Sequence, residues 1–261
     1  MRHMLRRLTG AVMLVCALGG LVTASAVADN YVALGDSYSA GTGTRDYSLN
    51  SGCNRGPYAY PALIKADRPN TNLTFVACSG AKTTDVLNNQ VQSLSTSTNI
   101  VTITIGGNDA GFSNVITQCA LPLVSCNSDI TNANNYISNT LPGQLNSVYS
   151  QIKTRAPNAT VVVLGYPRLF MGVDCNAGTF FSTDEMTKLN ATADLLKSVT
   201  AARAAAYGFT FKDAIPSFTG HAVCSSSEWL NGLSNPISDS YHPNRTGHKS
   251  GYEALVRQVI G

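Results

Sequence analysis

The fold of this chain is decided by the stretch Tyr31-Val32-Ala33-Leu34-Gly35-Asp36-Ser37-Tyr38-Ser39. It opens as a short apolar run and ends in Gly-Asp-Ser, which predicts a buried strand over 31–34 with Ser37 just past its carboxyl end. Open α/β sheets bind their ligands at that edge. Ser37 is therefore a candidate nucleophile, and a nucleophilic hydroxyl needs a general base that a third group orients.

Four more apolar, β-branched runs predict the remaining strands. Near-continuous apolar runs, without strict alternation, are typical of strands buried on both faces of a parallel sheet. Together with the first strand they predict a mostly parallel five-stranded sheet inside a three-layer α/β/α sandwich. The four predicted strands are 73–76, 100–105, 160–164 and 209–211.

Helical patterns lie between these strands. Apolar residues at helical spacing mark 86–94, a long segment over 130–152, a third over 186–199 and a last one over 252–260. Pro142 should kink or restart the long segment. No internal repeat, charge block or linker is visible, so we expect one domain over 29–261.

The first 28 residues have the features of a secretory signal peptide. Three arginines fall within the first seven residues, an apolar core runs over 11–22, and Ala26-Val27-Ala28 is a cleavage site of the A-x-A type. A membrane anchor is the weaker interpretation, because this core is shorter than the ~20 residues a spanning helix needs. The sequence thus predicts a secreted, extracellular protein without a stable membrane anchor.

Charge excludes one class of partner. Of 18 basic residues, three lie in the predicted signal peptide, which leaves 15 against 15 acidic residues and a net charge near zero. A nucleic-acid-binding protein would carry an excess of basic residues. We expect no nucleic-acid partner, and we expect a monomer.

Six cysteines remain once Cys16 is removed with the signal peptide. An even number in an exported protein indicates disulfides, and six cysteines allow 15 pairings. Sequential pairing is the simplest, since each bond then closes a local loop. No C-x-x-C occurs and no histidine lies at zinc-ligand spacing from a cysteine, so we expect no metal site. The predicted disulfides are Cys53–Cys78, Cys119–Cys126 and Cys175–Cys224.

A candidate base stands near the carboxyl end of the chain. After removal of the signal peptide only His221, His242 and His248 remain, and His242 alone has an acidic residue, Asp239, three positions before it. If Asp239 reaches Nδ1 within one turn, it fixes the tautomer, leaves Nε2 free to act as base and raises the pKa of the imidazole. The alternative is an ordinary loop aspartate and histidine.

Candidate oxyanion donors follow two other predicted strands. Gly106-Gly107-Asn108-Asp109 comes after strand 100–105, and Gly80 comes soon after strand 73–76. The Asn108 amide and the N–H groups of Gly80 and Ser37 could point at a developing negative oxygen. The alternative is a pair of plain turns, since Gly and Asn are common turn residues.

Taken together, these blocks resemble the SGNH, or GDSL-type, hydrolases. The matching segments are Gly35–Gly41, Gly80, Gly106–Asp109 and Asp239–Pro243, in that order along the chain. The cysteine layout and the segment Cys53–Pro61 are similar to the secreted lipases and esterases of actinomycetes. Tyr38 stands where the leucine of the family's name would be, as in other members of that subgroup.

The resemblance implies a flavodoxin-like fold and ester hydrolysis through an acyl-enzyme without any cofactor. It gives Ser37 as nucleophile, His242 as base and Asp239 as its partner, with oxyanion donors at Ser37, Gly80 and Asn108. Some members lack the aspartate and orient the histidine through a backbone carbonyl. The implied substrates are fatty-acyl esters, as for a lipase, esterase or phospholipase A. The alternatives are an acetyl esterase acting on polysaccharide and a non-catalytic binding protein.

Overall fold

The computed structural model describes residues 28–261. The predicted signal peptide therefore lies outside the described residues, apart from Ala28. Among the helices of 28–261, none is both long enough and apolar enough to cross a bilayer.

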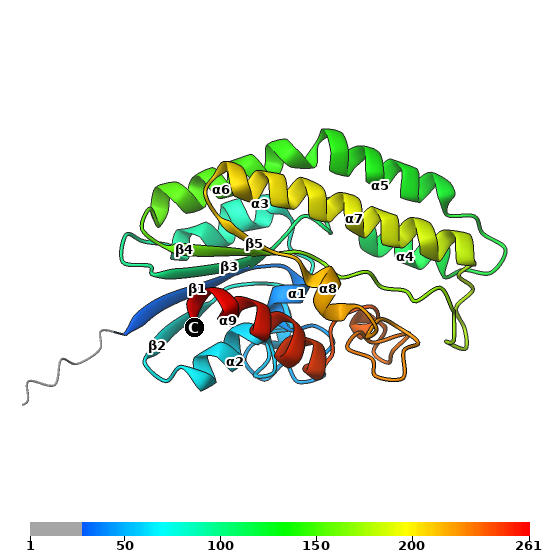
Figure 1. Cartoon of the computed structure of the whole chain (residues 1–261), viewed down its shortest axis with the longest axis horizontal. Coiled ribbons are helices and arrows are strands. Elements are labelled where there is room, and N and C mark those ends of the chain that lie inside the picture. The colour runs from blue at the N-terminus through cyan, green and yellow to red at the C-terminus, as the bar shows by residue number, and fades with distance from the viewer. Residues whose placement is uncertain (1–27) are drawn as a thin grey trace, which may run out of the picture.

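Five parallel strands form one sheet with the order β2-β1-β3-β4-β5. The predicted three-layer sandwich with a five-stranded parallel sheet is confirmed (Figure 1). Because β1 lies between β2 and β3, the loops that follow these three strands meet at one carboxyl edge. The strands are β1 (Asp29–Gly35), β2 (Thr71–Phe75), β3 (Ile100–Thr104), β4 (Thr160–Leu164) and β5 (Thr210–Lys212).

Strand β2 starts two residues earlier than the sequence predicted. Its first residues, Thr71 and Asn72, are polar, but they pair with Asp29 and Asn30 at the start of β1. Backbone pairing with the neighbouring strand, and not side-chain hydrophobicity, sets this boundary.

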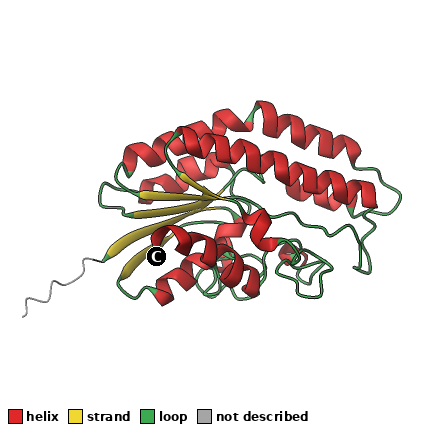
Figure 2. Ribbon diagram, in the orientation of Figure 1, coloured by secondary structure: helices red, strands yellow, loops and turns green. Residues whose placement is uncertain are grey.

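Helices cover both faces of the sheet (Figure 2). One layer holds α3 to α7, and the other holds α2 and α9 (Figure 1). Short helices α1 and α8 lie near the carboxyl edge of the sheet. The helices are α1 (Ser37–Ala40), α2 (Tyr60–Asp67), α3 (Thr83–Asp85), α4 (Phe112–Cys119), α5 (Asn127–Asn139), α6 (Leu141–Arg155), α7 (Thr183–Ala206), α8 (Ala214–Phe218) and α9 (Ala254–Ile260).

Side-chain alternation along β1 divides the core in two. Tyr31 and Ala33 pack in the cluster beneath α2 and α9, whereas Val32 and Leu34 pack in the cluster beneath α6 and α7. All four side chains are buried. This explains why the strand reads as one continuous apolar run.

The long helical pattern over 130–152 is two helices. Helix α5 ends at Asn139 and α6 begins at Leu141, with Pro142 in its first turn. Proline is tolerated there because a first-turn N–H has no intrahelical partner. The pattern over 86–94 forms a π-helical turn (Val86–Gln90) and a 3₁₀ turn (Val91–Ser93) instead of a regular helix.

All three predicted disulfides are present: Cys53–Cys78, Cys119–Cys126 and Cys175–Cys224. The first joins the loop after α1 to the segment after β2, directly beside Gly80. The second closes a short loop between α4 and α5. The third joins the segment before α7 to the loop after α8. Each bond therefore fixes a loop on the carboxyl side of the sheet.

Candidate active site

Ser37 lies at the turn from β1 into α1. Asp36 caps the helix, its carboxylate accepting from the Tyr38 N–H at 3.0 Å. Gly35 has φ +122°, and a Cβ there would lie 2.5 Å from the carbonyl oxygen of Thr104 on β3. Only glycine fits so close to the neighbouring strand. The Gly-Asp-Ser sequence thus turns the chain sharply and leaves Ser37 at the edge of the sheet.

The structure brings Ser37 and His242 together. His242 Nε2 lies 2.8 Å from Ser37 Oγ, and Nδ1 lies 2.9 Å from the carbonyl oxygen of Ser240. A carbonyl only accepts, so Nδ1 carries the proton and donates it to Ser240. Nε2 is then the acceptor for the serine hydroxyl, as a general base requires.

The prediction that Asp239 reaches Nδ1 is wrong. Its carboxylate accepts a hydrogen bond from the Tyr47 hydroxyl instead, and its second oxygen has no partner among the described residues. Three-residue spacing brings two side chains together only if the chain turns as a helix. Here Ser240 is extended and Tyr241 is left-handed, with φ +58°. This path presents the Ser240 carbonyl to the ring and directs Asp239 toward Tyr47.

The pKa of His242 is lowered, not raised. Burial lowers it to about 4, while the hydrogen bond to Ser240 and the charge of Asp239 act in the opposite direction. Desolvation disfavours the charged imidazolium, and here it outweighs both favourable contacts. The neutral base form therefore persists to acidic pH.

Tyr38 holds the histidine loop in place. Its hydroxyl donates to the carbonyl oxygen of Tyr241 at 2.7 Å, and its ring centroid lies 5.3 Å from that of His242. A leucine at position 38 could make the apolar contact but not the hydrogen bond. The departure from the family's leucine thus gives this site a polar contact between the turn that carries Ser37 and the loop that carries His242.

A buried polar network supports the turn that carries Ser37. Asp36 accepts from the Thr104 hydroxyl at 2.7 Å and from the Tyr166 hydroxyl. Burial raises the pKa of Asp36 to about 6, although these hydrogen bonds lower it. Gln90 binds both the N–H and the carbonyl of Gly35, at 2.7 and 2.9 Å. None of these supporting partners carries a sequence signal, because they come from distant segments.

The candidate oxyanion donors surround Ser37 on adjacent loops. Asn108 donates one amide hydrogen to the carbonyl of Ala81 at 3.0 Å, which fixes the amide and leaves its second hydrogen free. Gly80 has φ +80° and open space around its Cα, so backbone conformation, not crowding, requires glycine there. Within residues 28–261 the N–H groups of Ser37 and Gly80 donate to no protein acceptor.

The other two histidines have structural roles. His248 is buried, and its Nδ1 accepts from the Tyr60 N–H at 3.3 Å. Burial lowers the pKa of His248 to about 3, so it stays neutral. His221 stacks on Trp229 with ring centroids 3.9 Å apart.

An apolar cavity opens beside Ser37 and His242. Its volume is about 340 Å³, within the ~300–1,000 Å³ usual for ligand pockets. Side chains of α4, α7 and the loops beside them form most of its wall, and Ser37 and His242 lie on its polar side. The apolar lining residues include Phe112, Ile116, Leu121, Leu169, Ala193, Leu196, Leu233 and Ile237.

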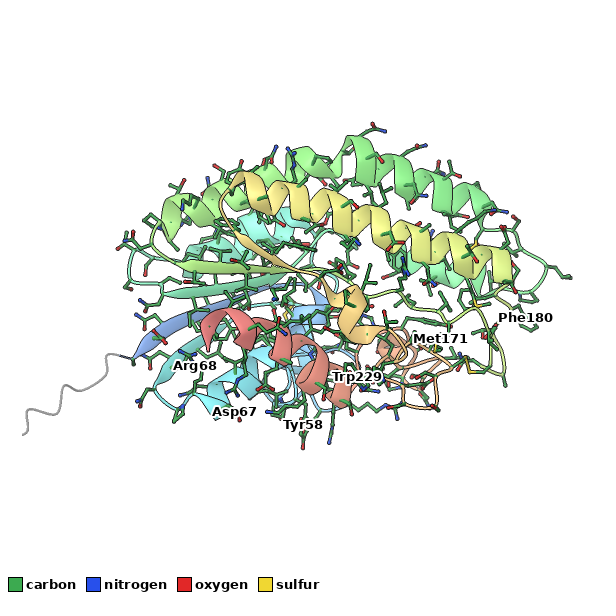
Figure 3. The ribbon with its side chains drawn as sticks, in the orientation of Figure 1. Tyr58, Asp67, Arg68, Met171, Phe180 and Trp229 are labelled. Atoms are coloured by element: carbon green, nitrogen blue, oxygen red, sulfur yellow. A yellow bond between two sulfur atoms is a disulfide. The ribbon has the colours of Figure 1, made fainter. Side chains whose placement is uncertain are left out.

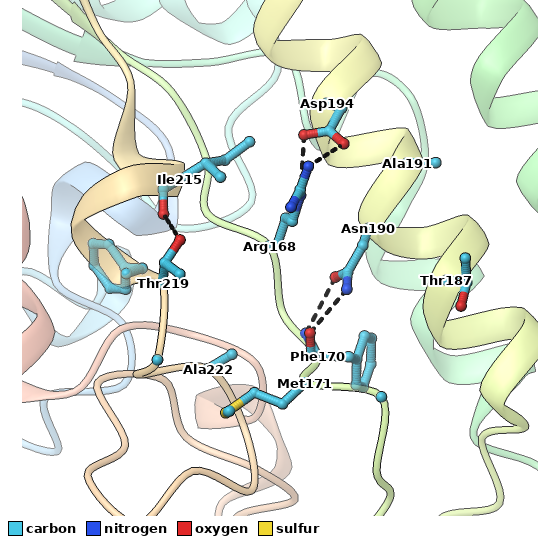
Figure 4. Close-up of a pocket in the computed structure, with 13 residues that line it drawn as sticks. Arg168, Phe170, Met171, Thr187, Asn190, Ala191, Asp194, Ile215, Thr219 and Ala222 are labelled. Carbon is cyan, nitrogen blue, oxygen red and sulfur yellow. Dashed lines mark hydrogen bonds and ion pairs between the residues drawn. The ribbon is translucent and has the colours of Figure 1, made fainter.

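A larger cavity of about 550 Å³ lies elsewhere, between α7, the segment after β4 and the loop after α8 (Figure 4). It contains neither Ser37 nor His242. Arg168 there is paired with Asp194 at 2.7 Å, and Asn190 holds the backbone of Phe170. These groups are already satisfied by one another, so we place the chemistry in the smaller cavity.

Known proteins resemble this chain in sequence and in overall fold. The model of the GDSL-like lipase/acylhydrolase family matches residues 33–250. A lipase of Streptomyces rimosus is 45% identical over 255 residues, covering 97% of this chain and 94% of that protein.

Two solved structures are similar over 88% of this chain and 99% of their own. The extracellular lipase from Streptomyces rimosus superposes with a TM-score of 0.84 at 46% identity. Phospholipase A1 from Streptomyces albidoflavus NA297 gives 0.83 at 47% identity. The chain therefore belongs to the GDSL-like lipase/acylhydrolase family, and it is a hydrolase of the lipase and esterase class.

Proposed function

We propose that this protein hydrolyses fatty-acyl esters through an acyl-enzyme on Ser37. The observation that carries the proposal is the 2.8 Å contact between Ser37 Oγ and His242 Nε2 at the wall of an apolar cavity. His242 removes the hydroxyl proton as Ser37 Oγ attacks the ester carbonyl carbon. The protonated imidazole then gives that proton to the departing alcohol, and a water molecule, activated by His242, releases the acid.

The negative oxygen formed in each step needs donors that are already in place. The free N–H groups of Ser37 and Gly80 and the second amide hydrogen of Asn108 are the donors we assign to it. The Cys53–Cys78 disulfide holds the Gly80 segment, so this wall of the site is rigid before substrate arrives.

The shape and apolar lining of the cavity support the proposal that the enzyme recognises its substrates by their acyl chain. Its wall is mainly apolar, and it begins directly at the nucleophile. An acetyl group would leave most of it empty, which disfavours the alternative of a polysaccharide acetyl esterase. The kinship with lipases and a phospholipase A1 supports the same choice. We further propose that the protein is exported by way of residues 1–28 and acts as a monomer.

A substrate panel tests the function. Nitrophenyl esters from acetyl to hexadecanoyl, acetylated xylan and a phosphatidylcholine should be compared at equal enzyme concentration. We expect hydrolysis of medium or long acyl esters to exceed that of acetylated xylan. Preference for acetylated xylan would favour the acetyl esterase, and no hydrolysis of any ester would favour a binding protein.

Asp239 acts on the base through charge in this proposal. Since His242 must be neutral to act, activity should fall as pH drops through its pKa of about 4. The Asp239 charge raises that pKa, so Asp239→Asn should move the acid limb of kcat/KM to lower pH and reduce kcat by less than about tenfold, that is 1.4 kcal/mol.

Asp184→Asn is the matched control, because it removes an exposed carboxylate on α7. Its pH profile should equal that of the wild type. A loss near the ~10⁴-fold seen when a serine protease loses its aspartate would instead make Asp239 a full member of a triad.

Ala193 offers a test of the acyl cavity. It is buried on α7 and lines the cavity, so Ala193→Phe should fill that space. We expect kcat/KM for dodecanoyl esters to fall about tenfold or more relative to butanoyl esters, in line with the value of a few methylene contacts. Ala191→Phe, at an exposed residue that lines the other cavity, is the control and should leave the ratio unchanged. An unchanged ratio in Ala193→Phe would contradict the assignment.

A further inference from the structure

Exposed apolar side chains gather on one part of the surface. Of nine large hydrophobic residues that are exposed in the described part of the chain, eight come from the segments 121–124, 171–180 and 233–237. The ninth is Leu49. We call these three segments the apolar rim. A surface with scattered apolar residues needs no explanation, but clustering on this scale is typical of an interaction site.

All three segments of the apolar rim contribute to the lining of the cavity that holds Ser37, although Met171, at the start of the second segment, lines the larger cavity instead. Leu121, Gly178, Leu233 and Ile237 all line the cavity that holds Ser37, and they come from all three segments of the rim. The segments also approach one another, since a Cβ on Gly178 would lie 3.5 Å from Leu233. Figure 3 shows the chain around Met171 and Phe180 at one end of the molecule.

Leu123 is not explained by folding. Its side chain is fully exposed, and its backbone is left-handed with φ +60°. This conformation costs a leucine roughly 1–2 kcal/mol, whereas glycine or asparagine adopts it readily. The loop that presents Leu123 is closed by Cys119–Cys126. An exposed apolar side chain in a strained backbone conformation, on a loop fixed by a disulfide, does not stabilise the fold. We therefore infer that Leu123 contacts a partner outside the protein.

The charge of the apolar rim indicates which kind of surface it can bind. Asp174 is the one charged residue in the three segments. Its carboxylate is occupied within its own loop, accepting from the Thr179 hydroxyl at 2.8 Å and the Phe181 N–H at 3.0 Å. The rim therefore offers no cationic group to an anionic surface and no free anion to a basic one. An uncharged or zwitterionic apolar phase suits it.

We propose that the apolar rim docks on the surface of aggregated zwitterionic lipid and directs an acyl chain from that surface into the cavity beside Ser37. Apolar side chains on the loops enter the acyl boundary, and the cavity mouth then faces the lipid instead of water. The proposal rests on the proposed function, because it supplies the physical state of the substrate for that same site.

Vesicle sedimentation tests the docking without turnover. Ser37→Ala protein and phosphatidylcholine vesicles should be mixed, and the partition coefficient measured. Burial of one leucine is worth about a factor of ten, so Leu123→Asn should weaken binding about tenfold. Its melting temperature should stay the same or rise, since asparagine suits φ +60°. Val173→Asp should weaken binding at least as much.

Asn158→Asp is the control for added negative charge, because it lies between α6 and β4, at the opposite edge of the sheet. It should bind like the parent. With Ser37 intact, Leu123→Asn should lose activity on vesicles but keep its activity on a soluble butanoyl ester. A double variant Leu123→Asn, Val173→Asp that binds vesicles like the parent would overturn the proposal.

Two further outcomes separate the hypotheses. If the parent forms a dimer that the rim substitutions dissociate, and vesicle binding is absent, the rim is an interface between copies and the lipid proposal is wrong. If the parent binds vesicles in a rim-dependent manner but the intact protein hydrolyses no ester, the docking surface stands and the proposed function fails.

Discussion

Ser37→Ala should lower kcat for a chromogenic ester by about 10⁴–10⁶-fold, the scale of loss when a hydrolase loses its serine nucleophile. The substitution removes the one atom that His242 Nε2 contacts at 2.8 Å, so no acyl-enzyme can form. Far-UV circular dichroism should be unchanged, because within residues 28–261 the Ser37 hydroxyl forms no hydrogen bond to the rest of α1. A serine-directed phosphonate should add its mass to the peptide that contains Ser37 and to no other.

Ser113→Ala is the matched control, since Ser113 is exposed and lines the same cavity. Its rate should stay within a few-fold of the wild type. Substantial activity in Ser37→Ala, or phosphonate on a different serine, would sink the proposed mechanism together with the role given to His242.

Asn108→Ala should lower kcat by about 10²–10³-fold with little change in KM, as the loss of one oxyanion donor typically does. The second amide hydrogen is needed only when the carbonyl oxygen becomes negative, so the effect belongs to the transition state. Asn108→Asp sharpens the test. It keeps the shape of the side chain but replaces the donor by a negative group, and it should lose at least as much. Rates near that of the wild type in both variants would show that Asn108 is an ordinary turn residue and not an oxyanion donor.

Much of the fold could be predicted because the sheet is buried on both faces. Val161 to Leu164 are all buried, and the predicted strand over 160–164 has the bounds of β4. Polar strand ends carry no such signal, which is why the start of β2 at Thr71 was missed. The break at Thr140 between α5 and α6 was only half predicted, since Pro142 marks the place but not whether a helix bends or restarts.

In the candidate site, the sequence predicted which residues take part better than it predicted which residues form hydrogen bonds with one another. Ser37 and His242 are 205 positions apart, yet each is marked by its own local motif. The partner of Nδ1 depends on the left-handed backbone of Tyr241, which no propensity rule assigns to a tyrosine. Tyr38 and Tyr47 complete the surroundings across 203 and 192 positions. Such contacts depend on the whole fold and leave no pattern in the sequence.

The Ser240 carbonyl has a consequence for how this enzyme tolerates mutation. A side-chain carboxylate can be lost by a single nucleotide substitution, and it becomes neutral at acidic pH. A backbone carbonyl oxygen is present in every amino acid and is not protonated in that pH range. Ser240→Ala should therefore leave Nδ1 oriented. The position sensitive to mutation is instead the next residue, Tyr241. Any substitution there that changes the backbone from φ +58° would turn the Ser240 carbonyl away from the His242 ring. The orientation of the His242 ring thus depends on the backbone conformation at Tyr241. The substitutions most able to disturb that orientation fall at Tyr241, whose side chain takes no part in proton transfer.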